Sequence, residues 1–208
     1  MNLNHYLEKR RFERIYNADY LIKPQDPPVL GLIEALCLEP DSVVIEFGSG
    51  EGHFTLPIAR KLKELRSSGL IFGFEFAEWM IEHLNEAAIE LDLEQQVRSW
   101  PITRLQPNIL PIKDDKADRI LAVNSIHYLD SPLAFYEEFA RILKPGGILL
   151  IADWIRHPAG EKGTDKLQSG LLENAFDHLF AIGLGIPEEL SIEVYSWVVR
   201  AKKPEITN

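Results

Sequence analysis

Residues 43–55 read Val43-Val-Ile-Glu-Phe-Gly-Ser-Gly-Glu-Gly-His-Phe-Thr55 and join a short apolar run to a turn with glycine at every second position. β-Branched side chains open the run, which is typical of a strand buried on both faces of a parallel sheet. Residues 54–65 then have the apolar spacing of a helix. Because glycine lacks a Cβ atom, the turn lets a ligand approach the backbone at the carboxyl end of the strand. A strand, a glycine turn and a helix in this order predict a nucleotide-type binding site.

The charges and the glycine spacing of this turn limit the kind of ligand. A dinucleotide fingerprint needs glycine or alanine three residues after its second glycine, and His53 stands there. Glu46 and Glu51 flank the turn, and their carboxylates would repel a pyrophosphate. The turn therefore suits a cationic ligand better than a dinucleotide.

Later segments continue the same alternation of strands and helices. Residues 69–80 contain a second apolar strand that ends at Glu75, near the spacing at which such folds place a ribose-binding acid. The alternative role for this acid is to cap the helix that follows it. Residues 118–129 predict another strand, which breaks at Asn124 into a loop. Residues 141–153 predict a helix end, a Pro-Gly-Gly turn and a further strand.

In order, spacing and residue type, residues 29–157 resemble the core of the class I S-adenosylmethionine-dependent methyltransferases. The resemblance rests on the Glu-x-Gly-x-Gly-x-Gly pattern that begins at Glu46 and on the Leu-Lys-Pro-Gly-Gly turn at 143–147. The Phe-Thr-Leu-Pro continuation at 54–57 is similar to the small-molecule branch, which includes the ubiquinone and menaquinone methyltransferases.

This resemblance implies both a fold and a reaction. The fold is an α/β, Rossmann-like, doubly wound and mostly parallel seven-stranded sheet with helices on both faces. The reaction is methyl transfer from S-adenosylmethionine to a small-molecule acceptor, which leaves S-adenosylhomocysteine. An in-line displacement of this kind needs the acceptor to be positioned and water to be excluded, and needs a base only if the attacking atom carries a proton.

The resemblance also assigns roles around the cofactor. The glycine turn would line its methionine half, and the Glu75 carboxylate would hold the ribose hydroxyls. Phe76 and Met80 would pack on ribose and adenine, and Asn124 would close over the methionine moiety. The expected cofactor-binding residues are Glu46, Gly48, Ser49, Gly50, Gly52, Glu75, Phe76, Met80, Ile102 and Asn124.

The adenine contact departs from the family pattern. Family members carry an acid after the third strand that accepts a hydrogen bond from the adenine amino group, and residues 97–108 contain no acid. Thr103, Gln106 or a main-chain group near Ile102 are the alternative acceptors. Trp100 could stack on the base, but a core position is the favoured interpretation.

His127 is the candidate catalytic residue. We expect it beside Asn124 at the carboxyl edge of the sheet, where it could accept the proton of a hydroxyl or amine acceptor. The alternative is a pocket-lining side chain that transfers no proton. No metal site is expected, because the six histidines are scattered and neither a His-x-x-x-His pair nor a pair of cysteines occurs.

The chain divides into an N-terminal helical lid or extension, residues 1–28, and an S-adenosylmethionine-binding domain, residues 29–208. Aromatic side chains of the extension could cover the cofactor cleft or simply hold this helix against the core; they are Tyr6, Phe12, Tyr16 and Tyr20. The lone Cys37 lies on a predicted apolar helix, residues 29–38, and is expected to be buried and inert.

The formal net charge of −10 weighs against nucleic acid as a substrate, because phosphates would be repelled. The apolar runs are too short to span a bilayer, so we expect a soluble, cytoplasmic monomer or homodimer. Two other function classes remain open. One is a nicotinamide-dependent oxidoreductase, and the other is a catalytically silent module that binds the cofactor.

Overall fold

The computed structural model describes residues 27–66, 68–102, 109–126, 129, 131–154, 174–192 and 196–206. Most of the predicted N-terminal lid lies outside these residues, as do His127, Thr103 and Gln106. The helices and strands are α2 (Pro27–Ala35), β1 (Val43–Phe47), α3 (Thr55–Glu64), β2 (Leu70–Glu75), α4 (Glu78–Glu90), β3 (Val97–Pro101), β4 (Ala117–Val123), α5 (Pro132–Ile142), β5 (Leu143–Trp154), a helix at 174–181, β6 (Glu188–Leu190) and β7 (Ser196–Lys202).

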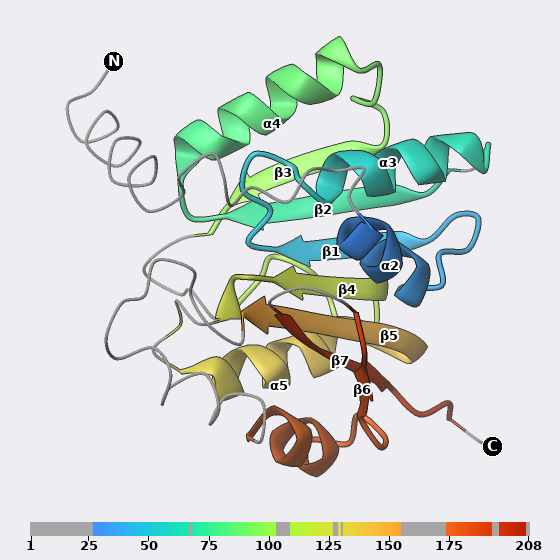
Figure 1. Cartoon of the computed structure of the whole chain (residues 1–208), viewed down its shortest axis with the longest axis vertical. Helices are drawn as coiled ribbons and strands as arrows, with labels where there is room; N and C mark the ends of the chain where they lie inside the picture. Colours follow the sequence, from blue (N-terminus) through green and yellow to red (C-terminus); the bar gives the residue numbers. More distant parts are fainter. Residues whose placement is uncertain are drawn as a thin grey trace.

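The strands form one seven-stranded sheet in the order β3-β2-β1-β4-β5-β7-β6 (Figure 1). The first five strands of this order are parallel, while β7 is antiparallel to both β5 and β6. Parallel strands need crossover connections, and α3, α4 and α5 are the helices that follow β1, β2 and β4. The predicted mostly parallel, Rossmann-like sheet is confirmed.

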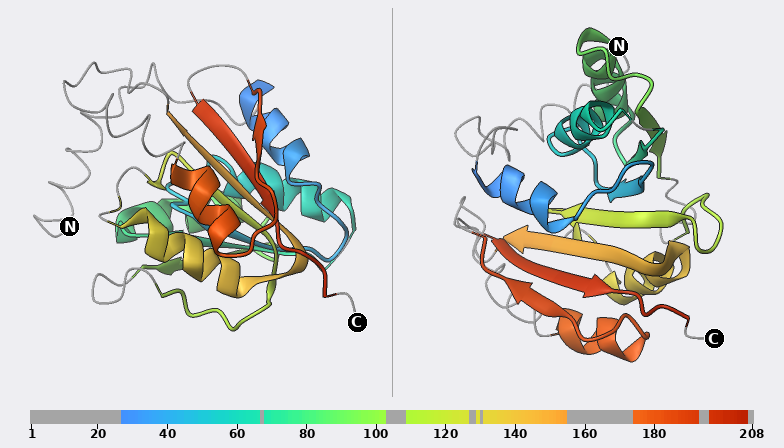
Figure 2. Two further views of the ribbon diagram at one scale, coloured as in Figure 1. Left: turned by 90° about the horizontal axis from the view of Figure 1, so that it is seen from below. Right: turned by 90° about the vertical axis from the view of Figure 1, so that its right-hand side faces the viewer.

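Helices cover both faces of the sheet (Figures 1 and 2). Apolar residues of α2, α3 and α4 share one core cluster, and those of α5 and the helix at 174–181 share the other. Neighbouring residues of one strand serve opposite clusters: Val44 packs on the α2 side and Ile45 on the α5 side. This double burial explains why β1 reads as an unbroken apolar run.

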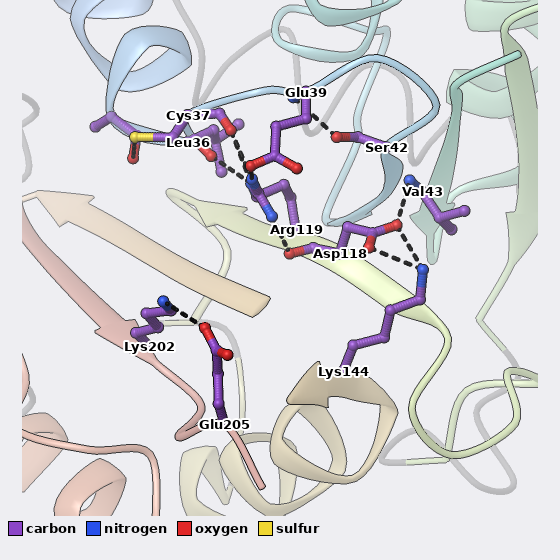
Figure 3. A network of polar contacts seen from close by, with 11 residues as sticks. Leu36, Cys37, Glu39, Ser42, Val43, Asp118, Arg119, Lys144, Lys202 and Glu205 are labelled. Atoms are coloured by element: carbon purple, nitrogen blue, oxygen red, sulfur yellow. Dashed lines mark hydrogen bonds and ion pairs between the residues drawn. The ribbon is translucent and has the colours of Figure 1, made fainter. Parts of the chain in front are cut away.

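The amino edge of the sheet is closed by a network of ion pairs and hydrogen bonds (Figure 3). The buried Arg119 guanidinium donates to the carbonyl oxygens of Leu36 and Cys37, at 2.6 Å for the shortest contact to each. The Asp118 carboxylate accepts from the Val43 amide at 2.9 Å and from Lys144 Nζ at 2.8 Å. These contacts tie α2, β1, β4 and β5 together at the edge opposite the glycine turn.

Two sequence predictions about single residues are wrong. Cys37 is exposed, because α2 ends at Ala35 and Cys37 turns the chain with a φ of 48°. Trp100 is not a core residue, since it lies on the edge strand β3 with 40% of its surface exposed. Its ring stacks on that of Phe72, with the ring centroids 5.4 Å apart.

The carboxyl-terminal strands complete the sheet. The strand that precedes β7 is β6, which begins directly after the glycine-containing turn at 182–187. The helix at 174–181 precedes this turn. None of the described helices is long and apolar enough to cross a membrane.

Candidate cofactor site

The glycine turn lies directly after β1 and is fastened to the neighbouring strand. The amides of Gly48 and Ser49 both donate to the Phe74 carbonyl of β2, at 2.8 and 3.1 Å. Gly48 has a φ of +77°, and a Cβ atom on it would lie 2.5 Å from the Ser125 Cβ. Glycine is required here because the loop after β4 packs against the turn.

Gly50 is surrounded differently. Its φ is +52°, and a Cβ atom built on it would meet no atom of the described residues within 4 Å. The open side of Gly50 is therefore the place at which a ligand can approach the main chain of the turn. Gly52, by contrast, would clash with Leu84 of α4, so its lack of a side chain serves packing.

Glu75, at the end of β2, joins the turn to the start of α4. Its Oε2 atom accepts from the Gly50 amide at 3.0 Å, and its Oε1 atom accepts from the Phe76 and Ala77 amides at 2.6 and 3.2 Å. Glu75 therefore contacts the glycine turn and the two residues that precede α4, whereas α4 itself, whose N-cap residue is Ala77, has no side-chain cap hydrogen bond within the described part of the chain. Burial raises the pKa of this carboxyl, while the three hydrogen bonds oppose the increase.

Glu46 is a second buried acid beside the turn, with 2% of its surface exposed. Thr55, at the first position of α3, donates its hydroxyl hydrogen to Glu46 Oε2. Burial raises the pKa of Glu46 to about 8, and the negative charge of Glu75 adds to the increase. A cation bound next to the two carboxyls would favour their charged forms.

Buried polar atoms near the turn lack partners within the described part of the chain. They are Ser49 Oγ and Asn124 Oδ1. Asn124 follows β4 with a φ of 49°, and its main-chain N–H donates to the Ala152 carbonyl oxygen at 2.8 Å. Buried polar groups normally have a hydrogen-bond partner, so both atoms are candidates for contact with a ligand or with water.

The residues expected around adenine and ribose gather near Glu75. Phe76 packs edge to face on Phe47, with ring centroids 6.0 Å apart. The Ile102 amide donates to the Glu75 carbonyl at 2.8 Å, and the Ile102 side chain is buried. Met80 is buried in a small cluster at the start of α4. The structure thus brings Ile102 and the start of α4 to the same acid.

These residues fit a nucleoside that carries positive charge but no phosphate. The turn offers backbone amides and open space at Gly50, and the side chains of Glu46, Ser49, Glu75 and Asn124 add oxygen atoms without a positive charge. Among the described residues, no group of three or more His, Cys, Asp and Glu side chains could hold a metal ion.

Residues 45–151 match the family model described as "Methyltransferase domain". The chain belongs to this methyltransferase family. The match runs from β1 to β5 and includes the glycine turn, Glu75 and the Pro-Gly-Gly turn. It confirms the family suspected from the sequence, whereas membership of the ubiquinone and menaquinone branch stays a prediction.

Curated relatives of this methyltransferase are distant. The chain is 22% identical over 152 residues to the 27-O-demethylrifamycin SV methyltransferase of Amycolatopsis mediterranei, an alignment that covers 73% of this chain and 50% of the relative. It is 25% identical over 148 residues to a biotin biosynthesis bifunctional protein of Teredinibacter turnerae, covering 67% of this chain and 25% of the relative. The methyltransferase therefore spans only a quarter to a half of the length of these two relatives.

Solved structures share the fold. A S-adenosylmethionine-dependent methyltransferase from Aquifex aeolicus superposes with a TM-score of 0.71 at 19% identity, and the alignment covers 97% of this chain and 100% of that one. The geranyl diphosphate C-methyltransferase of Streptomyces coelicolor, solved with S-adenosylhomocysteine, gives a TM-score of 0.66 at 15% identity, covering 84% and 78%. Both likenesses concern the fold.

Sequence reasoning missed two supporting side chains. Thr55 holds Glu46, and Ser125 Oγ donates to the Phe47 carbonyl at 3.0 Å, which fastens the loop after β4 to the end of β1. Thr55 could have been suspected because a hydroxyl at the first position of a helix lies close to the strand before it. No pattern in the sequence marks Ser125, since its partner is a backbone atom 78 positions away.

Proposed function

We propose that this methyltransferase transfers the methyl group of S-adenosylmethionine to a small-molecule acceptor. The observation that carries the proposal is the position of Glu75, whose carboxylate meets the Gly50 amide beside the open side of the turn. A carboxylate there can accept hydrogen bonds from two ribose hydroxyls, and no phosphate-binding cation is needed.

The proposed roles follow from the placement of the side chains. The backbone of the glycine turn, with Ser49 and Asn124, would hold the methionine half, and Glu46 would offset its positive charge. Phe76, Met80 and the main chain near Ile102 would bound ribose and adenine. When bound, S-adenosylmethionine supplies an electrophilic methyl group on a sulfonium. The protein then has to align the acceptor with this group and exclude water.

His127 remains the proposed proton acceptor for an acceptor molecule whose attacking atom carries a proton. It follows the loop of Asn124 and Ser125 by two positions. The N-terminal segment, residues 1–28, is proposed as a lid or extension that covers the cofactor cleft.

A small-molecule acceptor is favoured by the net charge of −10 and by the relatives, among which are enzymes named for rifamycin, sterol and geranyl diphosphate methylation. The net charge also supports our proposal that the protein does not bind nucleic acid. We further propose that it is a cytoplasmic monomer or homodimer that does not bind membranes. The second candidate function is a silent cofactor-binding module, which the missing acid in residues 97–108 favours.

The test is calorimetric titration with S-adenosylmethionine, S-adenosylhomocysteine and NADH. We expect micromolar binding of both sulfur nucleosides to the wild type, and binding at least ten-fold weaker in Glu75→Gln, which keeps the size of the side chain. Thermal unfolding of the variant separates lost binding from lost folding. Binding of NADH alone would contradict the proposal, and tight binding without turnover of any acceptor would favour the silent module.

A further inference from the structure

Polar side chains from three elements meet inside the apolar core on the α5 face of the sheet. They are Tyr136 of α5, Asp153 of β5 and Trp197 of β7, called here the Asp153 cluster. All three are almost completely buried, with 1%, 1% and 3% of their surfaces exposed. Asp153 and Trp197 are direct partners in the antiparallel β5–β7 ladder, so both side chains project to the same face.

Tyr136 lies on α5, the helix that packs on this face of the sheet. Tyr136 and Trp197 belong to the same core cluster. Burial raises the pKa of the Tyr136 hydroxyl, and the nearby negative charge of Asp153 raises it further. The Tyr136 ring is also 6.5 Å from the ring of His178, on the helix at 174–181. The phenol thus lies between two helices and the end of β5.

Hydrogen-bonding capacity is left over in this cluster. Tyr136 Oη and Trp197 Nε1 are buried, and neither has a hydrogen-bond partner within the described part of the chain. A buried N–H or O–H group without a partner is destabilising, and it is normally satisfied by water or by a ligand. Trp197 is the ladder partner of Asp153, and the Tyr136 hydroxyl is near enough to be influenced by the charge of Asp153, so the cluster offers donors and an acceptor in one region.

The cluster is also close to the candidate cofactor site. The Asn124 amide donates to the carbonyl oxygen of Ala152, the residue before Asp153, at 2.8 Å. Asp153 therefore lies at the carboxyl edge of the sheet, one position beyond the residue that holds the Asn124 loop. The contacts of Arg119 and Asp118 lie at the opposite, amino edge. The cluster therefore shares its edge of the sheet with the site of the proposed reaction.

We propose that Asp153, Tyr136 and Trp197 bind a hydroxyl group of the methyl acceptor. A hydroxyl group can donate to the Asp153 carboxylate while it accepts from Trp197 Nε1–H or Tyr136 Oη–H. An ammonium group has no acceptor for these donors, and a carboxylate group would face the charge of Asp153. These residues bind and orient the acceptor, and the inference rests on the proposed methyl transfer.

The test uses pairs of small probes. Both members of a pair carry the same methyl-accepting thiol, amine or phenol, and one member carries an additional hydroxyl group, called here the second hydroxyl. Formation of S-adenosylhomocysteine is followed by mass spectrometry, and kcat and KM are determined. For wild type we expect KM to be at least ten-fold lower for the hydroxylated member of a pair. In Asp153→Asn and Trp197→Phe this preference should fall to below three-fold, with kcat changed less than KM.

Matched variants and binding data separate the possible failures. Asp177→Asn, on the exposed face of the helix at 174–181, and Trp100→Phe, on the edge strand, should keep the wild-type preference. Tyr136→Phe keeps the ring and tests the hydroxyl alone. Turnover without a preference for the second hydroxyl in wild type, or an unchanged preference in both cluster variants, would overturn the inference alone. Failure to bind S-adenosylmethionine, or binding without turnover of any probe, would overturn the proposed function and the inference with it.

Discussion

The amino and carboxyl ends of the parallel strands, called here the two edges, differ in how completely their polar side chains are paired. At the amino edge, the Arg119 guanidinium is surrounded by carbonyl oxygens and Asp118 is paired with Lys144. At the carboxyl edge, Glu46 and Glu75 lie near each other, and polar atoms of Ser49 and Asn124 lack partners among the described residues. Satisfied polar groups stabilise the fold, whereas groups left incomplete mark the place where a ligand can add the missing contacts.

The largest effect should come from the amino edge. Arg119→Ala would leave the carbonyl oxygens of Leu36 and Cys37 without their buried donor, so we expect the free energy of unfolding to fall by roughly 3 kcal/mol. Urea denaturation measures this change. Arg60→Ala, at an exposed position of α3, is the control and should stay within about 0.5 kcal/mol of wild type. A loss below about 1 kcal/mol for Arg119→Ala would show that this edge is not a structural clamp.

The glycine turn allows a sharper comparison between two neighbouring positions. Gly48→Ala places a methyl group against Ser125 and should lower the free energy of unfolding by about 2 kcal/mol or more. In Gly50→Ala the added methyl group meets no atom of the part of the chain that the structure describes, so the cost should be limited to the backbone strain of about 1 kcal/mol.

Cofactor affinity should be the quantity that Gly50→Ala changes most, although this variant is the less destabilised of the two. In Gly50→Ala the methyl group occupies the open side of the turn, and we expect S-adenosylhomocysteine to bind at least ten-fold more weakly by calorimetry. Affinity equal to that of wild type in a folded Gly50→Ala variant would place the ligand elsewhere.

Glu46 predicts how stability depends on pH. Its pKa is raised from an ordinary value of 4.5 to about 8, so the folded protein holds a proton that the unfolded chain releases. The resulting stabilisation is complete below pH ~4.5 and is lost as the pH rises through ~8, with a slope of at most about 1.4 kcal/mol per pH unit. Denaturation of Glu46→Gln should show a flatter profile between pH 6 and 8. Identical pH profiles for the variant and the wild type would show that Glu46 does not hold an extra proton in the folded protein.

The smallest effect is expected at Glu51, the other acid beside the turn. It is exposed and contacts His83 Nδ1 at 3.0 Å, so its charge is screened by solvent. Glu51→Gln should change the free energy of unfolding by less than about 0.5 kcal/mol and the affinity for S-adenosylmethionine by less than three-fold. A larger loss of affinity would mean that exposed carboxylates, and not only the buried ones, contribute to the binding of S-adenosylmethionine.

Patterns that repeat along the chain predicted the fold well. Apolar strands, helical spacing and glycine turns are local properties, and they gave the sheet, the turn at 48–52 and the acid at the end of β2. The sequence could not predict contacts between distant residues, such as Ser125 with Phe47. It misplaced Trp100 because an aromatic side chain on an edge strand has the same local pattern as one in the core. Cys37 was misplaced because nothing local showed that α2 ends at Ala35.

The position of β7 between β5 and β6 bears on the order in which the sheet assembles. The strands that carry the glycine turn, Glu75 and Asn124 are complete once residue 124 has been synthesised. Among the described strands β6 pairs only with β7, so β6 can join the sheet only after the later segment has been made. In the order of synthesis, the strands around the proposed cofactor site therefore come before the strands beside the proposed acceptor site. Until β7 pairs with β5, the outer edge of β5 presents unpaired backbone groups, so we expect the chain to be most prone to aggregation during this interval.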